Sequence, residues 1–181
     1  RRSGRMEPMD AIYLDHNATT PIRPEVEEAM ARAHRDGYAN PASQHQLGQK
    51  ARRLLDDARE RIATLLGGRL GGAQGDRLIF TSGGTEANNL ALIGMARARS
   101  AGAPGHLIIS AIEHASLIEP AEWLLEQGWR LDSLGVTEEG VIRADRLAER
   151  LTPETALVST MLANHDTGTI QPVESLAATC R

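Results

Sequence analysis

Residues 78–89 read LIFTSGGTEANN, an apolar run followed by two glycines and a threonine. The apolar run at residues 78–81 predicts a strand, and Thr85 predicts a helix that starts directly after the turn. The first N–H groups of a helix lack intrahelical partners and carry partial positive charge, and Gly83 and Gly84 let an anion approach the backbone. The stretch therefore predicts a strand, a loop and a helix with a phosphate site at the helix start.

The residues around the two glycines restrict which phosphate-containing ligand this loop can bind. No Lys-Ser or Lys-Thr pair follows them, as a nucleoside-triphosphate loop requires, and the G-x-G-x-x-G spacing of a dinucleotide loop is absent from this stretch. Because Thr85 adds a hydroxyl donor, we expect a small phosphorylated cofactor. On these residues alone, an ordinary strand-to-helix turn with a capping threonine stays open as the alternative.

The rest of the chain predicts an α/β fold. Short apolar runs alternate with longer amphipathic ones from residue 77 onward. We expect strands at 78–81, 107–110, 129–136 and 156–163, and helices at 86–99, 117–127, 144–150 and from 173. This alternation is typical of a mostly parallel sheet with helices on both faces, in which ligands bind beyond the carboxyl ends of the strands.

The residues before the sheet predict an irregular arm at 13–24 and two helices. The first covers residues 25–35 and is followed by a polar loop, and the second is long. Apolar residues at helical spacing predict a core-facing stripe on the long helix: Ala51, Leu54, Leu55, Ala58, Ile62, Leu65 and Leu66. Lys50 lies on its other face and is expected to be a solvated surface charge.

Composition excludes several classes of function. The net charge is −4, and the aromatic residues are two tryptophans, two tyrosines and one phenylalanine, which argues against nucleic-acid binding. No apolar run approaches the roughly twenty residues that cross a membrane, and the start lacks the apolar core of a secretory signal. We therefore expect no membrane partner and a cytoplasmic protein.

Cysteine and histidine usage predicts neither a disulfide nor a metal site. Cys180 is the only cysteine, and its apolar helical neighbours favour a packed, inert thiol over a nucleophile. The histidines at 16, 34, 45 and 106 show no ligand spacing.

Polar residues follow two of the predicted strands. Glu113 and His114 come after the strand at 107–110, and residues 164–168 come after the strand at 156–163. A phosphate at one strand end, the imidazole of His114 at the next and the amide of Asn164 at a third would hold a flat phosphorylated ring. Each residue has an ordinary alternative, His114 as a polar residue at a helix start and Asn164 as a turn former.

Five ordered motifs between residues 12 and 181 resemble the cysteine desulfurases, which are class-V, fold-type I enzymes dependent on pyridoxal 5′-phosphate. The motifs are residues 13–21 (YLDHNATTP), 40–43 (NPAS), 81–89 (TSGGTEANN), 113–114 (EH) and 164–172 (NHDTGTIQP). The resemblance implies that Gly84 and Thr85 bind the cofactor phosphate. It also implies that His114 stacks on the pyridine ring and assists catalysis, and that Asn164 hydrogen-bonds the ring hydroxyl. The family usually has Asn-Asn-Glu where this chain has Asn-His-Asp, which leaves the subfamily open.

The resemblance also implies what lies beyond Arg181: the aspartate that pairs with the pyridinium nitrogen, the Schiff-base lysine and the persulfide cysteine. Lys50 and Cys180 come too early to be the last two. We therefore expect a fragment of a fold-type I transferase, truncated before the end of its large domain. The expected parts are a disordered or non-native extension (1–11), an arm with helices (12–66), a glycine-rich connector (67–76) and the incomplete cofactor-binding domain (77–181).

The function implied for the parent enzyme is conversion of L-cysteine to L-alanine, with transfer of sulfur to an enzyme cysteine as a persulfide. The family further implies a homodimer and a sulfur-acceptor protein such as an iron–sulfur scaffold. Selenocysteine lyases and other class-V enzymes share the cofactor frame and remain alternatives, as does a non-catalytic protein that retains the fold. Without the lysine, we expect the fragment alone to be inactive.

Overall fold

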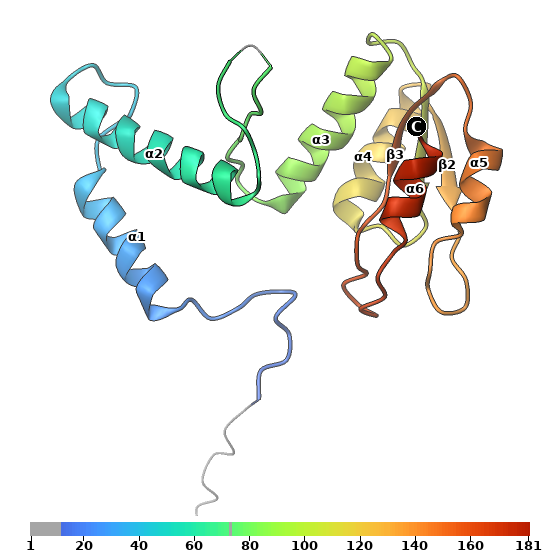
Figure 1. The fold of residues 1–181 in the computed structure, drawn as a ribbon, viewed down its shortest axis with the longest axis horizontal. Helices are drawn as coiled ribbons and strands as arrows, with labels where there is room; N and C mark the ends of the chain where they lie inside the picture. Colours follow the sequence, from blue (N-terminus) through green and yellow to red (C-terminus); the bar gives the residue numbers. More distant parts are fainter. Residues whose placement is uncertain (1–11, 73) are drawn as a thin grey trace, which may run out of the picture. The chain divides into compact units, whose positions relative to one another are not determined.

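Two compact units make up the chain, Arg1–Ile79 and Phe80–Arg181 (Figure 1). The structure is a computed structural model that describes residues 12–72 and 74–181. The extension expected at residues 1–11 lies outside the described residues.

The first unit contains the two helices that the sequence predicts, α1 (Pro24–Asp36) and α2 (Gln46–Leu65). Proline stands at the start of α1, where its missing N–H costs no hydrogen bond. His45 caps α2, because its Nδ1 accepts a hydrogen bond from the Gly48 amide at 3.2 Å. A Cβ on Gly48 would lie 2.3 Å from the Ser43 carbonyl oxygen, so only glycine lets the polar loop pack this closely on α2.

The predicted core-facing stripe of α2 is only partly buried. Ala51 and Ala63 are buried, whereas Leu65 is 86% exposed and Leu66, just after the helix, is 75% exposed. Among the described residues of this unit, α1 is the other helix and packs on α2 over a short stretch. The periodicity thus predicted the helix correctly but not how much of its apolar face is covered.

The second unit is built on a parallel three-stranded sheet in the order β2-β1-β3. Its strands are β1 (His106–Ser110), β2 (Arg130–Leu134) and β3 (Thr155–Ser159). Its helices are α3 (Gly84–Arg99), α4 (Ala115–Glu126), α5 (Leu147–Arg150) with the preceding 3₁₀ turn η1 (Ala144–Arg146), and α6 (Val173–Thr179). The predicted α/β fold with a parallel sheet is confirmed.

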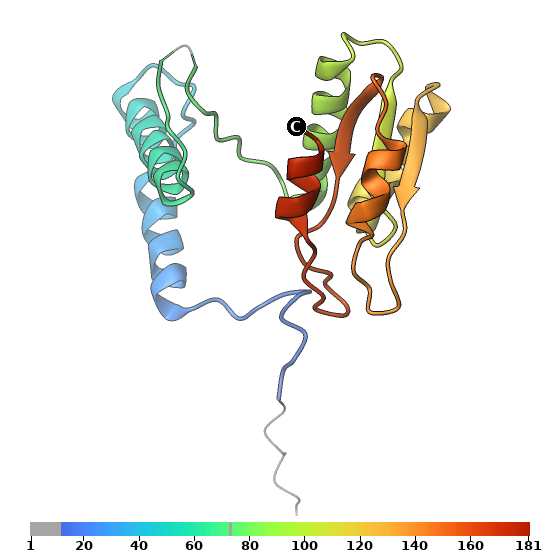
Figure 2. The same cartoon turned by 45° about the vertical axis from the view of Figure 1, so that its right-hand side comes forward.

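Helices cover β1 on both faces (Figure 2). Leu107 packs with Leu124 of α4 on one face, and Ile108 packs with Leu147 of α5 and Leu176 of α6 on the other. Successive side chains of a strand point to opposite faces, so a strand covered on both sides is apolar throughout its middle. All five residues of β1 are buried.

The prediction of a strand at residues 78–81 is wrong. These residues form no strand, and Ile79 is 70% and Phe80 45% exposed. A strand needs a neighbour to pair its backbone groups, and none of the three strands in the described part of the chain pairs with this segment. The strands expected at 129–136 and 156–163 exist but are shorter, at Arg130–Leu134 and Thr155–Ser159.

Candidate active site

The helix start expected to hold a phosphate is open. α3 begins at Gly84, its N-cap residue is Gly83, and no side chain caps it. A Cβ on either glycine would meet no atom within 4 Å. Thr85, the second residue of the helix, is exposed. The first N–H groups of a helix lack intrahelical partners, so the uncapped start of α3 suits an anion.

The loop before α3 is held by a carboxylate. Glu86 Oε2 accepts hydrogen bonds from the Ser82 amide at 2.6 Å and from the Ser82 hydroxyl at 2.7 Å. These two bonds, the backbone one first, lower the pKa of Glu86. Because the carboxylate takes the Ser82 amide, the groups left for a ligand at this helix start belong to the residues around Gly84 and Thr85.

His114 lies at the start of α4 and is its N-cap. Its Nδ1 accepts a hydrogen bond from the Ser116 amide at 3.0 Å and lies 2.8 Å from the Ser116 hydroxyl. His114 is therefore a polar residue at a helix start, as the alternative interpretation expects. This capping contact does not exclude a functional role, because the same ring lines a groove beyond the carboxyl end of β1.

That groove lies where ligands bind in open parallel sheets. The chain runs from β1 to β2 on one side and later places β3 on the other side of β1, so the ends of β1 and β3 flank the switch in strand order. The groove has a volume of about 530 Å³. It is lined by Ile112, Glu113, His114, Ala115, Asn164, His165, Asp166 and Thr167. The structure thus brings His114 and Asn164 together, as expected of loops that follow neighbouring strands.

Asn164 forms the turn that its residue type favours. Its Oδ1 accepts hydrogen bonds from the Asp166 amide at 3.0 Å and the Thr167 amide at 2.9 Å. Its Nδ2 makes only long contacts, 3.4 Å to the Ile112 carbonyl oxygen and 3.5 Å to the Met161 sulfur. Nδ2 is therefore the atom of this side chain that a ligand oxygen can engage.

Gly84 and Thr85 do not line the groove, but hydrogen bonds connect their helix to His114. Asn88 Nδ2 donates to the Ser116 hydroxyl at 2.8 Å. Asn89 Nδ2 lies 2.8 Å from the Thr85 carbonyl oxygen and 3.3 Å from that of Ser116. Two neighbouring asparagines of α3 thus tie the open helix start to the start of α4. The sequence shows this pair within its Gly-Gly-Thr motif, but no periodicity assigns it a partner.

Glu113 is a further residue whose role the sequence did not reveal. It is buried, and its Oε1 accepts hydrogen bonds from the Ser110 hydroxyl and from the Met161 amide, the latter at 2.8 Å. Its Oε2 is buried without a hydrogen-bond partner among the described residues. The side chain ties the loop after β1 to the segment after β3, and so fixes the two sides of the groove. A carboxylate just after an apolar strand is the only sequence signal for it.

His165 occupies one of the positions where the chain departs from the family pattern. Its ring centroid lies 5.4 Å from that of His114, in an edge-on arrangement, and its Nε2 lies 3.7 Å from Asp166 Oδ2. His165 and Asp166 are the two residues that depart from the family pattern. Both line the same groove as His114 and Asn164.

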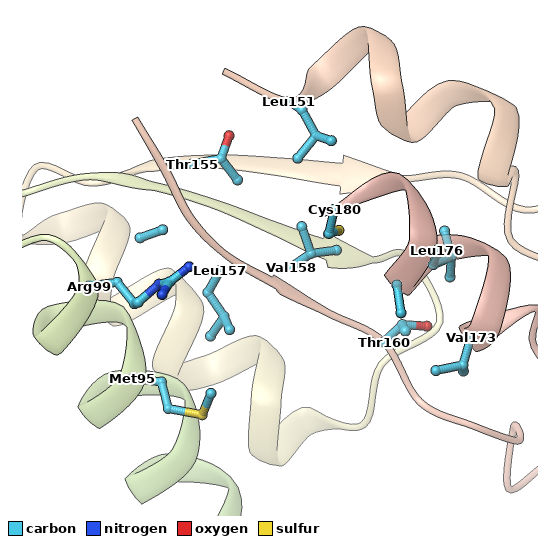
Figure 3. Close-up of a pocket in the computed structure, with 12 residues that line it drawn as sticks. Met95, Arg99, Leu151, Thr155, Leu157, Val158, Thr160, Val173, Leu176 and Cys180 are labelled. Carbon is cyan, nitrogen blue, oxygen red and sulfur yellow. The ribbon is translucent and has the colours of Figure 1, made fainter. Parts of the chain in front are cut away.

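A second hollow, of about 440 Å³, lies between α3, β3 and α6 (Figure 3). Its lining is mainly apolar, includes Met95, Leu157 and Val173, and contains none of the four predicted site residues. Cys180 also lines it. The expectation of a packed thiol is wrong, since Cys180 is exposed. Partial burial nevertheless raises the pKa of the thiol, which disfavours the thiolate and thus a nucleophilic role.

Lys50 is on the first unit, on the surface of α2. Its side chain is 48% exposed, and its Nζ lies 3.3 Å from Asp36 Oδ1. This confirms the expected surface charge. Within residues 12–72 and 74–181, no group of three or more His, Cys, Asp or Glu side chains is arranged to hold a metal ion. In the same residues no helix combines the length and apolarity needed to cross a membrane.

The chain resembles known proteins in both sequence and structure. Residues 12–181 match the family model of class-V aminotransferases. The chain is 42% identical over 166 residues to cysteine desulfurase IscS of Dictyoglomus turgidum, covering 92% of this chain and 41% of that protein. It resembles a solved NifS-like protein with a TM-score of 0.83 and 32% identity, covering 93% of this chain and 44% of the other.

A third relative is the solved structure of SspA in complex with cysteine, with a TM-score of 0.79, 33% identity, and coverage of 93% of this chain and 47% of SspA. The chain thus spans less than half the length of these relatives. Class-V aminotransferases and cysteine desulfurases depend on pyridoxal phosphate. The match over residues 12–181 shows that the chain belongs to the class-V aminotransferase family.

Proposed function

We propose that this chain is part of a pyridoxal-phosphate-dependent cysteine desulfurase, which converts L-cysteine to L-alanine and passes the sulfur to an enzyme cysteine as a persulfide. The observation that carries the proposal is the groove at the ends of β1 and β3, where His114 and Asn164 meet. Similarity to cysteine desulfurase IscS over 92% of the chain supports the reaction, and SspA, solved with cysteine, supports the substrate.

The residues present fit the cofactor. The phosphate needs N–H donors and room at a helix start, and Gly83 and Gly84 leave that room open. When bound, pyridoxal phosphate supplies an electron sink for bond cleavage at the substrate. In our proposal Gly84 and Thr85 hold the phosphate, His114 stacks on the ring and holds a proton at Nε2, and Asn164 Nδ2 donates to the ring oxygen.

We also propose the finer properties that the family implies. The complete enzyme is a cytoplasmic homodimer that delivers sulfur to an acceptor such as an iron–sulfur scaffold protein. The 181-residue chain by itself is inactive, because its one lysine is the exposed Lys50 of α2.

Product analysis with the complete enzyme tests the proposed reaction. With L-cysteine and added pyridoxal phosphate, we expect equal amounts of L-alanine and of sulfur bound as persulfide. L-selenocysteine serves as the comparison substrate, because preference for it would identify a selenocysteine lyase. A complete protein that binds pyridoxal phosphate but releases no alanine from either substrate would contradict the proposal.

A further inference from the structure

Asn88 and Ser116 form a chain of hydrogen bonds that ends on His114. Asn88 Nδ2 donates to the Ser116 hydroxyl at 2.8 Å, and that hydroxyl lies 2.8 Å from His114 Nδ1. The Ser116 amide also donates to Nδ1, at 3.0 Å. Neither Asn88 nor Ser116 lines the groove, and their hydrogen bonds lead to it through the imidazole.

These contacts fix where the ring carries its proton. A backbone N–H can only donate, so a proton on Nδ1 would point at another hydrogen and break the cap of α4. The Asn88 amide donates to the Ser116 hydroxyl, which favours pointing the hydroxyl proton toward Nδ1. Within the described part of the chain, Nε2 has no hydrogen-bond partner, and it is the ring nitrogen available to a ligand.

We infer that Asn88 and Ser116 are positioning residues that hold His114 with Nδ1 unprotonated and the ring proton on Nε2. His114 therefore acts in the groove as a hydrogen-bond donor through Nε2. The inference rests on the proposed function solely for the identity of the group that Nε2 contacts.

The arrangement also joins two parts of the site. Asn88 lies one turn after Gly84 on α3, so the helix that would hold the phosphate also sets the state of the ring. Asn89, its neighbour, bonds only to backbone carbonyl oxygens, those of Thr85 and Ser116. Asn88 and Asn89 are thus a matched pair: the same residue type on the same helix, both bound to Ser116, but only Asn88 through the hydroxyl.

The experiment is nitrogen NMR of the complete protein labelled with ¹⁵N-histidine, without cofactor, at a single pH. The pH is held constant because other ionisable side chains also line the groove, namely those of Glu113, His165 and Asp166. The His114 signals are assigned by their loss in His114→Asn. We expect an unprotonated Nδ1 and a protonated Nε2. A neutral ring that carries its proton on Nδ1 overturns the inference.

Variants then test Asn88 and Ser116 separately. Losing one neutral hydrogen bond should change the ratio of the two ring forms by about twofold to tenfold in Asn88→Ala and Ser116→Ala. Ser116→Thr, which keeps the hydroxyl, should restore the ratio, and Asn89→Ala should leave it unchanged. If Asn88→Ala behaves like Asn89→Ala, the role of Asn88 is wrong. The readout needs neither cofactor nor turnover, so absence of desulfurase activity would contradict the proposed function and leave this result standing.

Discussion

His114 combines a structural contact with a position in the groove, and this decides how it should be tested. Its Nδ1 caps α4, while its ring lies beside His165 at the mouth of the proposed cofactor site. Alanine would remove both features at once. Asparagine removes the ring but keeps a side-chain acceptor suited to a helix N-cap.

We therefore expect His114→Ala to lower the free energy of unfolding by about 0.5–2 kcal/mol more than His114→Asn does. Denaturant unfolding of the complete protein, read by circular dichroism, provides the measurement. Equal losses in the two variants would show that the Ser116 amide gains nothing from the capping side chain.

The burial of His106 leads us to expect that the stability of the protein depends on pH. It is 1% exposed, its Nδ1 lies 2.8 Å from both Thr155 Oγ1 and Arg130 Nη2, and its Nε2 lies 3.2 Å from Asp132 Oδ2. Burial first, and then the charge of Arg130, lower the pKa of His106, although Asp132 opposes them.

The imidazole of His106 takes up a proton near pH 6.5 in the unfolded chain but only at lower pH in the folded chain. The free energy of unfolding should therefore fall as the pH drops below about 6.5. The fall should stop below the lowered folded pKa. Thermal unfolding midpoints between pH 7.5 and 5 should decline less in His106→Gln than in the wild type. Parallel declines in the two proteins would show that His106 does not cause the effect.

At the scale of elements, the start of α3 depends on Glu86. Its lowered pKa means that the hydrogen bonds from Ser82 are fully present above the ordinary value of 4.5 and are lost as the pH falls through the lowered folded value. The Ser82 amide resonance should therefore titrate below pH 4.5 in the wild type. In Glu86→Gln it should not titrate in that range. A signal that moves identically in both proteins would assign the titration to another carboxyl group.

The helices and strands also indicate how much of the fold could be predicted from the sequence. Apolar periodicity located α1 to α6 and the three strands of the sheet, because apolar residues recur along them at the spacing of a helix or a strand, even in α1, where no residue is buried. It failed at residues 78–81, where strand formation depends on a partner strand and not on local composition. It also could not show that Glu113 bonds to Met161 or Asn88 to Ser116, because these pairs are far apart in sequence and carry no periodic signal.

At the scale of the whole molecule, the proposal that this chain is inactive alone rests on its lysine. The open helix start, the ring of His114 and the amide of Asn164 are present, and the one lysine is exposed on α2. Incubating the 181-residue chain with pyridoxal phosphate, followed by borohydride reduction and peptide mapping, should give no stoichiometric adduct at Lys50. A stoichiometric adduct there, together with alanine release from cysteine, would overturn the proposal that this chain is inactive alone.

Above all, we propose that the open start of α3 holds the cofactor phosphate while His114 acts on the cofactor ring. Titration of pyridoxal phosphate into the complete enzyme, followed by alanine release, compares Thr85→Val with His114→Asn. Thr85→Val loses a hydrogen bond to a charged group, worth roughly 1.5–3 kcal/mol, so cofactor affinity should fall about tenfold to a hundredfold.

Excess cofactor should restore the activity of Thr85→Val. In His114→Asn the cofactor should stay bound while turnover falls by about a hundredfold, and excess cofactor should not restore it. Full recovery of His114→Asn with cofactor, alongside no recovery of Thr85→Val, would contradict the assignment of the two residues.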